Sequence, residues 1–530
     1  MVILLTLLMA CQAPEPEEIP HMDAVELLTR TSLDLRGIRP TTDEFQAVQN
    51  DPTQVEVLIE EFLYSENFGP RAADLFTEVF LTQTETYYLD ATAYGADVTQ
   101  AAFIESIGEE VPQMVAEVAK NDLPWTDLVQ GNWTMANETL AKIWPVTYPE
   151  NANGWQRSSY TDGRPGSGVL STNSMWWRYT STVSNANRKR ANAISRIFLC
   201  HDYLLRKIDF DRNVNLLDQE SVDNALQNNA ACVNCHSSLD PLAGYLYGFW
   251  HNNNNSVVDV TYYHPEREQH WRTYSGIAPE YYGTPGYTLT DLGNQLASDN
   301  RVIQCAVEHS WELLLRRQKT MEDTDILSKH REAFLAGELT LRALFRSIIQ
   351  TPQYRAGLTD EPGTVSKKMV TPKLLASQIE GLTGFRWTRE GYDVMGSDTF
   401  GYLTLAGGAD GYFVTAHATQ PNATLVLVQE RLAEAAAAYA VHEDRSGEAE
   451  VRLFHHVDFT ETPETDREAM VAQIQALHQR IYGQVIQPDG EEVLANLELW
   501  SDLHAVEDDI PQAWVGLLSA LLREPALLFY

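Results

Sequence analysis

Basic residues are scarce in this chain. Of its 530 residues, 38 are Lys or Arg and 74 are Asp or Glu, which gives a formal net charge of −36. An excess of negative charge repels phosphate, so this composition argues against nucleic acid and anionic lipid headgroups as partners. Hydrophobic residues make up 44% of the chain, which is ample for cores, and the length predicts about three domains.

Long apolar runs are also missing. Residues 2–10 are apolar except for Thr6, but this run is far shorter than the roughly 20 residues that a membrane span needs. It has the length of a signal-peptide core. The residues Leu8-Met9-Ala10-Cys11 are typical of a bacterial lipobox, in which Cys11 is lipidated. Because no Lys or Arg precedes the run, we expect the true start codon to lie upstream of Met1.

The segment after Cys11 supports a lipid anchor. Residues 12–18 are rich in Pro and Glu, as suits a tether between a membrane and a folded domain. Gln12 is not the Asp that retains many lipoproteins on the inner membrane. We therefore expect a lipid-anchored protein of the bacterial cell envelope, on the outer membrane and facing the periplasm or the cell surface.

Cysteine is scarce as well, with 5 in the whole chain. Two of them stand in the sequence Cys232-Val233-Asn234-Cys235-His236, and C-x-x-C-H is the spacing that attaches a c-type haem. The thiols of Cys232 and Cys235 would bind the porphyrin covalently, and His236 would be the proximal iron ligand. The sequence therefore predicts one covalent haem c as cofactor.

A C-x-x-C pair has other uses. It can be a thioredoxin-like redox couple, half of a zinc site or a disulfide. No strand–helix–strand pattern surrounds residues 226–246, and the chain contains no second C-x-x-C. Both absences favour haem attachment, which also agrees with an exported protein in an oxidising compartment.

Two cysteines remain once those for lipid and haem are set aside. Cys200 and Cys305 could form a disulfide, which would suit the periplasm, or they could be two buried free thiols. The sequence leaves both alternatives open.

Signatures of hydrolytic and phosphate-binding enzymes are missing. We find no Ser-His-Asp signature and no H-E-x-x-H, and the glycine-rich residues 407–411 are not followed by the Lys-Ser/Thr of a phosphate loop. The cluster at residues 455–458, His-His-Val-Asp, is more typical of a surface or a core than of a metal site. We assign no catalytic residue and expect an electron carrier rather than a catalyst.

Helical periodicity dominates the rest of the chain. Apolar residues at helical spacing predict helices at residues such as 55–64, 103–119 (where Pro112 could interrupt the helix) and 424–439. Alternating residues predict short strands at 257–263 and 451–459. The predicted fold is mainly α, a multi-domain helical protein with a cytochrome c-like haem-binding segment and few short strands. The expected divisions are a signal and linker, an N-terminal helical domain, a haem domain and a mainly helical C-terminal domain, at residues 1–20, 21–165, 166–360 and 361–530.

Several motifs carry a family resemblance. They are Ser32 to Thr41, Asp122 to Asp127, Asn137 to Ala141, Gly168 to Ser171, Asn187 to Arg190, Leu199-Cys200, Cys232 to His236 with Leu239 to Ala243, and Cys305 with Leu313 to Arg317. Together they resemble the planctomycete-type cytochrome c family, multi-domain secreted or lipid-anchored bacterial proteins built from domains of unknown function. Two features depart from the family: Arg316-Arg317 stands in place of Gly-Arg, and the loop at 251–255 differs.

The resemblance implies a mostly helical fold and a covalently held haem. Met175 is the candidate sixth iron ligand, because it lies in the segment that resembles the family's pre-haem motif. Met321 and His251 are its rivals. A thioether ligand would raise the redox potential and a second histidine would lower it, whereas an open position would permit small-molecule chemistry.

The sequence therefore predicts a lipid-anchored, extracytoplasmic c-type cytochrome that exchanges electrons with a redox partner protein. One alternative is a surface binding or scaffold lipoprotein with a structural haem, because a carrier of one haem needs only about 100 residues. Another is a haem enzyme of the peroxidase or oxidase type.

Overall fold

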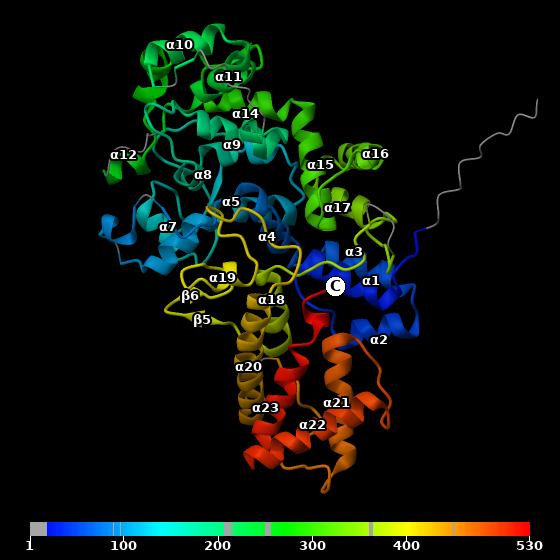
Figure 1. Cartoon of the computed structure of the whole chain (residues 1–530). Coiled ribbons are helices and arrows are strands. Elements are labelled where there is room, and N and C mark those ends of the chain that lie inside the picture. The colour runs from blue at the N-terminus through cyan, green and yellow to red at the C-terminus, as the bar shows by residue number, and fades with distance from the viewer. Residues whose placement is uncertain are drawn as a thin grey trace, which may run out of the picture.

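The computed structural model of this chain is built mainly of helices, as the sequence predicts (Figure 1). It describes residues 19–87, 89–95, 97–205, 214–215, 217–249, 256–359, 364–447, 449 and 451–530. The candidate lipidation site Cys11 and the candidate ligand His251 lie outside these residues. Within the described ranges, no helix is long and apolar enough to cross a membrane.

The N-terminal part is helical from residue 24 onwards. Its helices are α1 (Ala24–Arg36), α2 (Thr42–Asn50), α3 (Gln54–Leu63), α4 (Phe68–Phe80), α5 (Gln100–Lys120), α6 (Asp127–Gln130) and α7 (Glu138–Ile143). Local sequence sets the turn between the first two. Gly37 ends α1 with a left-handed φ of 74°, and Thr41 and Glu44 form a reciprocal capping box at the start of α2.

Pro112 does not interrupt α5. The helix runs through it, although proline removes one intrahelical hydrogen bond. On either side of Pro112, Val111 and Val115 are fully buried, and α5 packs along α4. This packing stabilises a helix that the local sequence disfavours.

The middle of the chain continues with short and medium helices. They are α8 (Asn173–Arg178), α9 (Arg188–Leu199), α10 (Gln219–Asn228), α11 (Ala230–Ala243), α12 (Val257–Thr261), α13 (Trp271–Tyr274), α14 (Leu289–Ala297), α15 (Asn300–Leu315), α16 (Thr324–Ala336) and α17 (Leu341–Ile349). At the end of α15, Arg316 adopts the left-handed conformation with φ 55°. The resemblance noted above predicts Gly at this position, and Gly reaches that conformation without strain. Arg316 forms an ion pair with Glu78 instead.

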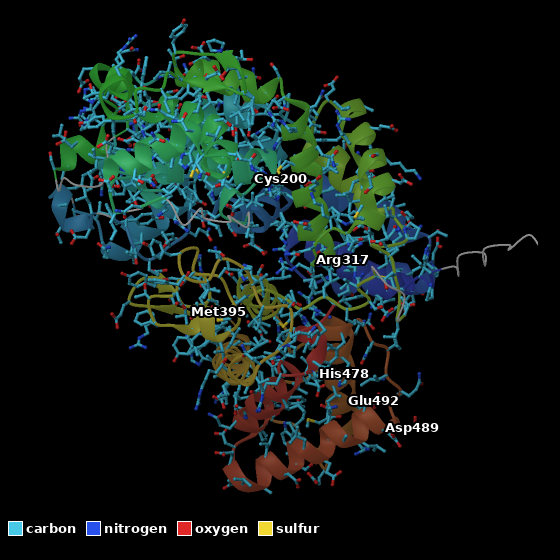
Figure 2. All side chains as sticks on the ribbon, turned by 45° about the horizontal axis from the view of Figure 1, so that its top comes forward. Cys200, Arg317, Met395, His478, Asp489 and Glu492 are labelled. Atoms are coloured by element: carbon cyan, nitrogen blue, oxygen red, sulfur yellow. A yellow bond between two sulfur atoms is a disulfide. The ribbon has the colours of Figure 1, made fainter. Side chains whose placement is uncertain are left out.

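The C-terminal part forms a second group of helices. These are α18 (Pro372–Thr383), α19 (Tyr402–Leu405), α20 (Ala423–Ser446), α21 (Arg467–Tyr482), α22 (Glu491–Glu507) and α23 (Ile510–Leu521). Figure 1 shows α20–α23 at one end of the molecule and α9–α14 at the other. In the turned view of Figure 2, Cys200 lies in the upper part, and His478 and Glu492 lie in the lower part.

Strands are confined to three short antiparallel pairs in the described ranges. These are β1 (Thr134–Ala136) with β2 (Gln156–Ser158), β3 (Glu280–Tyr281) with β4 (Thr284–Pro285), and β5 (Thr388–Arg389) with β6 (Tyr392–Asp393). Both strands predicted from alternation were wrong. Residues 257–261 form α12, and residues 451–459 are irregular.

Side chains replace a strand partner in residues 451–459. The backbone N–H groups of Leu453 and Phe454 donate to Asp444 Oδ2, and those of His455 and His456 donate to Gln473 Oε1. The backbone is therefore satisfied without a ladder. His455 and His456 therefore belong to a turn that is held by the buried side-chain amide of Gln473.

Two large hydrophobic cores follow from this arrangement. One contains buried residues from Leu27 to Tyr354, so residues on both sides of position 165 share it. The other contains residues from Met369 to Tyr530 together with Leu33 of α1. A smaller cluster lies around Trp144 and Trp177.

Candidate functional site

Helix α11 carries the C-x-x-C-H motif. The side chain of Asn229 caps its first turn by accepting from the N–H of Ala231. Cys232, Cys235 and His236 are spaced i, i+3 and i+4, which places them on one face of a helix. The helix packs on α9, α10, β3 and the turn at residues 244–246. The structure thus brings together the three residues predicted to hold haem.

His236 is held by a buried carboxylate. Its Nδ1 lies 2.9 Å from Oδ1 of Asp240, one turn further along α11. The Asp240 side chain is 3% exposed. Because the Asp240 carboxylate can only accept a hydrogen bond, the proton of the His236 ring lies on Nδ1. The other ring nitrogen, Nε2, then has the lone pair that could bind a metal.

Arg188 fixes the carboxylate in turn. From the start of α9, its Nε donates to Oδ1 of Asp240 at 2.7 Å and its terminal nitrogen donates to Oδ2 at 3.0 Å. Burial opposes the charge on Asp240. The hydrogen bonds from His236 and Arg188 nevertheless hold the pKa of this carboxyl below its usual range. The result is an ionised Asp240 that orients His236.

The two thiols of the motif differ in exposure. Cys235 is buried, whereas Cys232 is partly exposed. In the described part of the chain neither is in a disulfide. Their types and spacing, with the Nε2 lone pair of His236 beside them, fit the donor set of a c-type haem.

Exposed apolar side chains lie next to this helix. The hydroxyl of Tyr203 is 2.7 Å from Ser238 Oγ on α11 and 3.4 Å from the hydroxyl of Tyr282. Beside Tyr203, Leu204 and Leu205 are 82% and 83% exposed.

Other aromatic residues after the motif belong to the core. Tyr245, Tyr247 and Phe249 are buried. Phe249 packs against Trp176 and Tyr263 with ring centroids 5.6 and 5.1 Å apart. Phe249 therefore packs between α8 and the segment after α11.

The candidate sixth ligands lie in different surroundings. Met175 is fully buried on α8, which packs on α5. Met321 is 88% exposed, in the short turn before α16. Met175 is therefore in the main core, and the sixth ligand stays a prediction.

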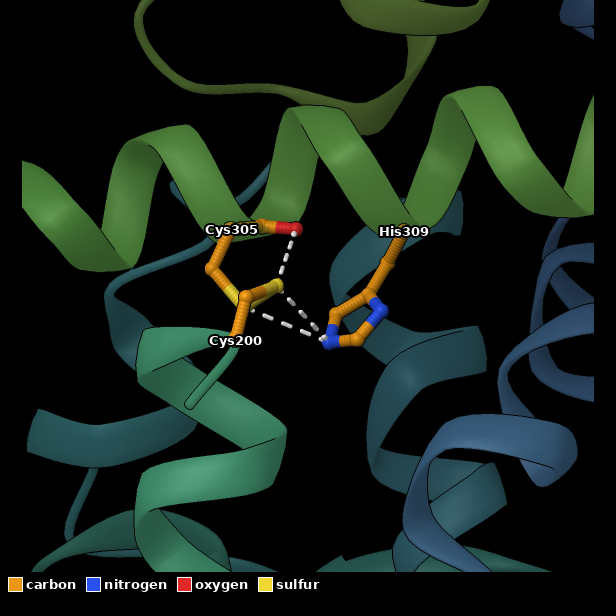
Figure 3. A group of neighbouring side chains, drawn as sticks. All are labelled: Cys200, Cys305 and His309. Carbon is orange, nitrogen blue, oxygen red and sulfur yellow. Dashed lines mark hydrogen bonds between the residues drawn. A yellow bond between two sulfur atoms is a disulfide. The ribbon is translucent and has the colours of Figure 1, made fainter. Parts of the chain in front are cut away.

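Cys200 and Cys305 form a disulfide between α9 and α15, with 5.3 Å between their Cα atoms. His309 lies beside it, one turn after Cys305 on α15 (Figure 3). Sequence reasoning missed this histidine, although its i+4 spacing from Cys305 is a usable signal. It also missed Asp240, which has the same spacing from His236, and Arg188, for which no local signal exists.

A cavity of about 330 Å³ opens between α5, α18 and the β5–β6 hairpin. Charged side chains of both signs line it, including Glu105, Glu109, Lys373 and Glu380. It lies between the N-terminal and C-terminal parts of the chain, and its volume is at the small end of ligand sites.

Comparison with known proteins covers only the N-terminal part. Residues 6–157 match the family PSCyt2, described as a protein of unknown function (DUF1549). The match ends before the motif at residues 232–236. No curated protein matches the chain, and no solved structure matches it. The family match agrees with the resemblance drawn from the N-terminal motifs.

Proposed function

We propose that this chain is an extracytoplasmic c-type cytochrome that carries one covalent haem and transfers electrons. Cys232 and Cys235 hold the haem through thioether bonds, and His236 is the proximal ligand through Nε2. The observation that carries the proposal is the chain of contacts from Arg188 to Asp240 to His236. It orients a histidine as a metal ligand, directly after two cysteines at haem spacing.

These residues also set the electronic properties of the site. Haem supplies a one-electron couple when bound. An ionised carboxylate on Nδ1–H makes His236 a stronger donor, which favours the oxidised, more positive iron. Arg188 moderates this effect because it shares the negative charge of Asp240. With haem bound, the ionised Asp240 would therefore act on the potential through His236, in the direction of a lower value.

The location of the protein is part of the proposal. A lipid on Cys11 tethers the chain to a membrane of the cell envelope, most simply the outer membrane. A disulfide between Cys200 and Cys305 is compatible with an oxidising compartment. A Cys11→Ser variant that still fractionates with membranes would exclude this anchor.

The test is covalent haem in the purified protein. We expect haem to stay with the denatured chain after export in a host that matures c-type cytochromes, and a sharp α-band on reduction. Cys232→Ala with Cys235→Ala should abolish covalent haem. His236→Ala should change the spectrum, whereas His456→Ala, at an exposed histidine of the C-terminal part, should not. A parent protein without covalent haem would refute the proposal.

A binding lipoprotein with a structural haem is the second candidate. The cavity between α5 and α18 favours it, because haem attachment at α11 does not account for that cavity. Rapid reduction and reoxidation by soluble redox proteins supports the carrier, whereas a haem inert to them supports the binding protein. Binding of an exogenous ligand such as CO to the reduced iron would instead favour a haem enzyme.

A further inference from the structure

Three potential metal ligands meet where α9 ends against α15 (Figure 3). Nε2 of His309 lies 3.3 Å from Sγ of Cys305 and 3.5 Å from Sγ of Cys200. Cys200 is the C-cap of α9, and Cys305 and His309 lie one helical turn apart on α15. They do not belong to the haem motif on α11.

The distances resemble those within a metal site. A tetrahedral Zn²⁺ has Zn–S bonds of about 2.3 Å and Zn–N bonds of about 2.0–2.1 Å, which separate sulfur and nitrogen by about 3.6 Å. Both nitrogen–sulfur distances observed here are close to that value. His309 therefore already has the position of a ligand relative to each sulfur. Only the sulfurs must move apart, to about 3.8 Å, and this requires reduction of the disulfide.

His309 is tied to the backbone in the disulfide form. Its Nε2 donates to the carbonyl of Ile197 over 3.1 Å. A bound cation would take the place of this proton, and the ring would carry its proton on Nδ1.

The carbonyl oxygen of Ile197 lies on the same side. It is 3.5 Å from Sγ of Cys305 as well as 3.1 Å from Nε2 of His309. An oxygen at such distances is placed for the fourth position of a tetrahedron, directly or through a water molecule.

We propose that reduction of the Cys200–Cys305 disulfide opens a site for one thiophilic cation such as Zn²⁺, with both sulfurs and Nε2 of His309 as ligands. The disulfide is then a switch between a closed form without metal and a metal-binding form.

The reductant is a protein dithiol. Cys305 is 1% exposed, whereas Cys200 at the end of α9 is accessible, so a thiolate attacks the Cys200 sulfur. The bond between Cys200 and Cys305 breaks, and Cys305 leaves as a thiolate beside the Nε2–H of His309. The second thiol of the reductant then displaces Cys200, so that the dithiol becomes a disulfide and both cysteines become thiols. Binding of Zn²⁺ releases the two thiol protons.

The test uses the full chain with Cys11→Ser, Cys232→Ala and Cys235→Ala, in which Cys200 and Cys305 are the remaining cysteines. The protein is reduced with a phosphine without oxygen and titrated with Zn²⁺ against a chromophoric chelator. We expect one Zn²⁺ per reduced chain and none per oxidised chain. Co²⁺ in place of Zn²⁺ should give the charge-transfer absorbance of thiolate ligands in a tetrahedral field.

Two variants separate a built site from loose thiol binding. His309→Gln should weaken Zn²⁺ binding at least about tenfold, because one ligand is lost. His330→Gln is the matched control, since His330 is another buried histidine, on α16, and bonds Ser347 instead. It should leave the affinity unchanged. Equal affinity in the His309→Gln and parent proteins, or no uptake by the reduced chain, would overturn the proposal. Thiols in an unfolded chain would bind without dependence on His309, so loss of folding cannot imitate the expected result.

Discussion

The ion pair between Lys368 and Asp34 lies deep in the fold and should be sensitive to substitution. Both side chains are 1% exposed, and the two charged groups are in direct contact. Asp34 also accepts hydrogen bonds from the hydroxyls of Tyr354 at 2.6 Å and Tyr530 at 2.9 Å. The other acceptor for Lys368 is the carbonyl of Leu314 at 3.0 Å. The network therefore joins α1 to the C-terminal part of the chain.

Loss of Asp34 should lower the free energy of unfolding more than loss of Lys368 does. Asp34→Asn leaves the buried Lys368 ammonium with neutral acceptors alone, the Asn amide oxygen and the Leu314 carbonyl, and loss of the charged partner from a buried pair costs about 3–5 kcal/mol. Lys368→Met leaves Asp34 with two tyrosine donors, so we expect a smaller loss of about 1–3 kcal/mol. In the double variant neither charge remains. Its cost should be below the sum of the two single costs by at least about 1 kcal/mol.

Urea unfolding followed by tryptophan fluorescence measures these differences in the free energy of unfolding. The neighbouring pair of Lys367 and Glu26 is the matched control, because its side chains are 50% and 45% exposed. Lys367→Met should change stability by less than about 0.5 kcal/mol. If Asp34→Asn costs no more than Lys367→Met, or if the single costs simply add, the reasoning about the buried pair is refuted.

The same pair predicts a dependence on pH. Burial lowers the pKa of Lys368 from 10.5 to about 7, with Asp34 acting in the opposite direction. Between these values the unfolded chain holds the proton and the folded chain does not, so stability rises as pH rises from 7 towards 10.5. Lys368→Met should remove this contribution. An unchanged slope in the variant would contradict it.

Three further predictions concern other parts of the chain. Replacing both Cys200 and Cys305 by Ala should cost about 4.7 kcal/mol in urea unfolding, because the disulfide closes a loop of 105 residues; a cost below about 1 kcal/mol would contradict the chain-entropy argument. Burial raises the pKa of Glu110 from 4.5 to about 7, so the folded chain holds this proton more tightly than the unfolded chain does. Stability should therefore fall as pH rises from 4.5 to 7, and the thermal midpoint of Glu110→Gln should not show this fall. With haem attached as proposed, Asp240→Asn should raise its redox potential in a spectroelectrochemical titration, because His236 becomes a weaker donor. An equal or lower potential would argue against the role of Asp240.

Features within one turn of helix could be predicted well. The capping box of Thr41 and Glu44 and the stop at Gly37 depend on neighbouring residues alone. The predicted helix at 424–439 is part of α20. The predicted strands were wrong because alternation over a few residues does not supply a hydrogen-bonding partner. At residues 453–456 the side chains of Asp444 and Gln473 satisfy the backbone instead.

Periodicity, caps and the C-x-x-C-H spacing act over a few residues. The mainly helical fold was therefore predictable from the sequence, and the haem prediction at residues 232–236 depends on the same local signals. The contact between Asp240 and His236 could also be predicted, because the two residues lie four positions apart on one helix. Tertiary packing places Arg188 on Asp240 and His309 beside the disulfide. It also brings Lys368 to Asp34, 334 positions away in the sequence. Such contacts depend on how helices pack, and packing brings together residues whose spacing along the chain carries no signal.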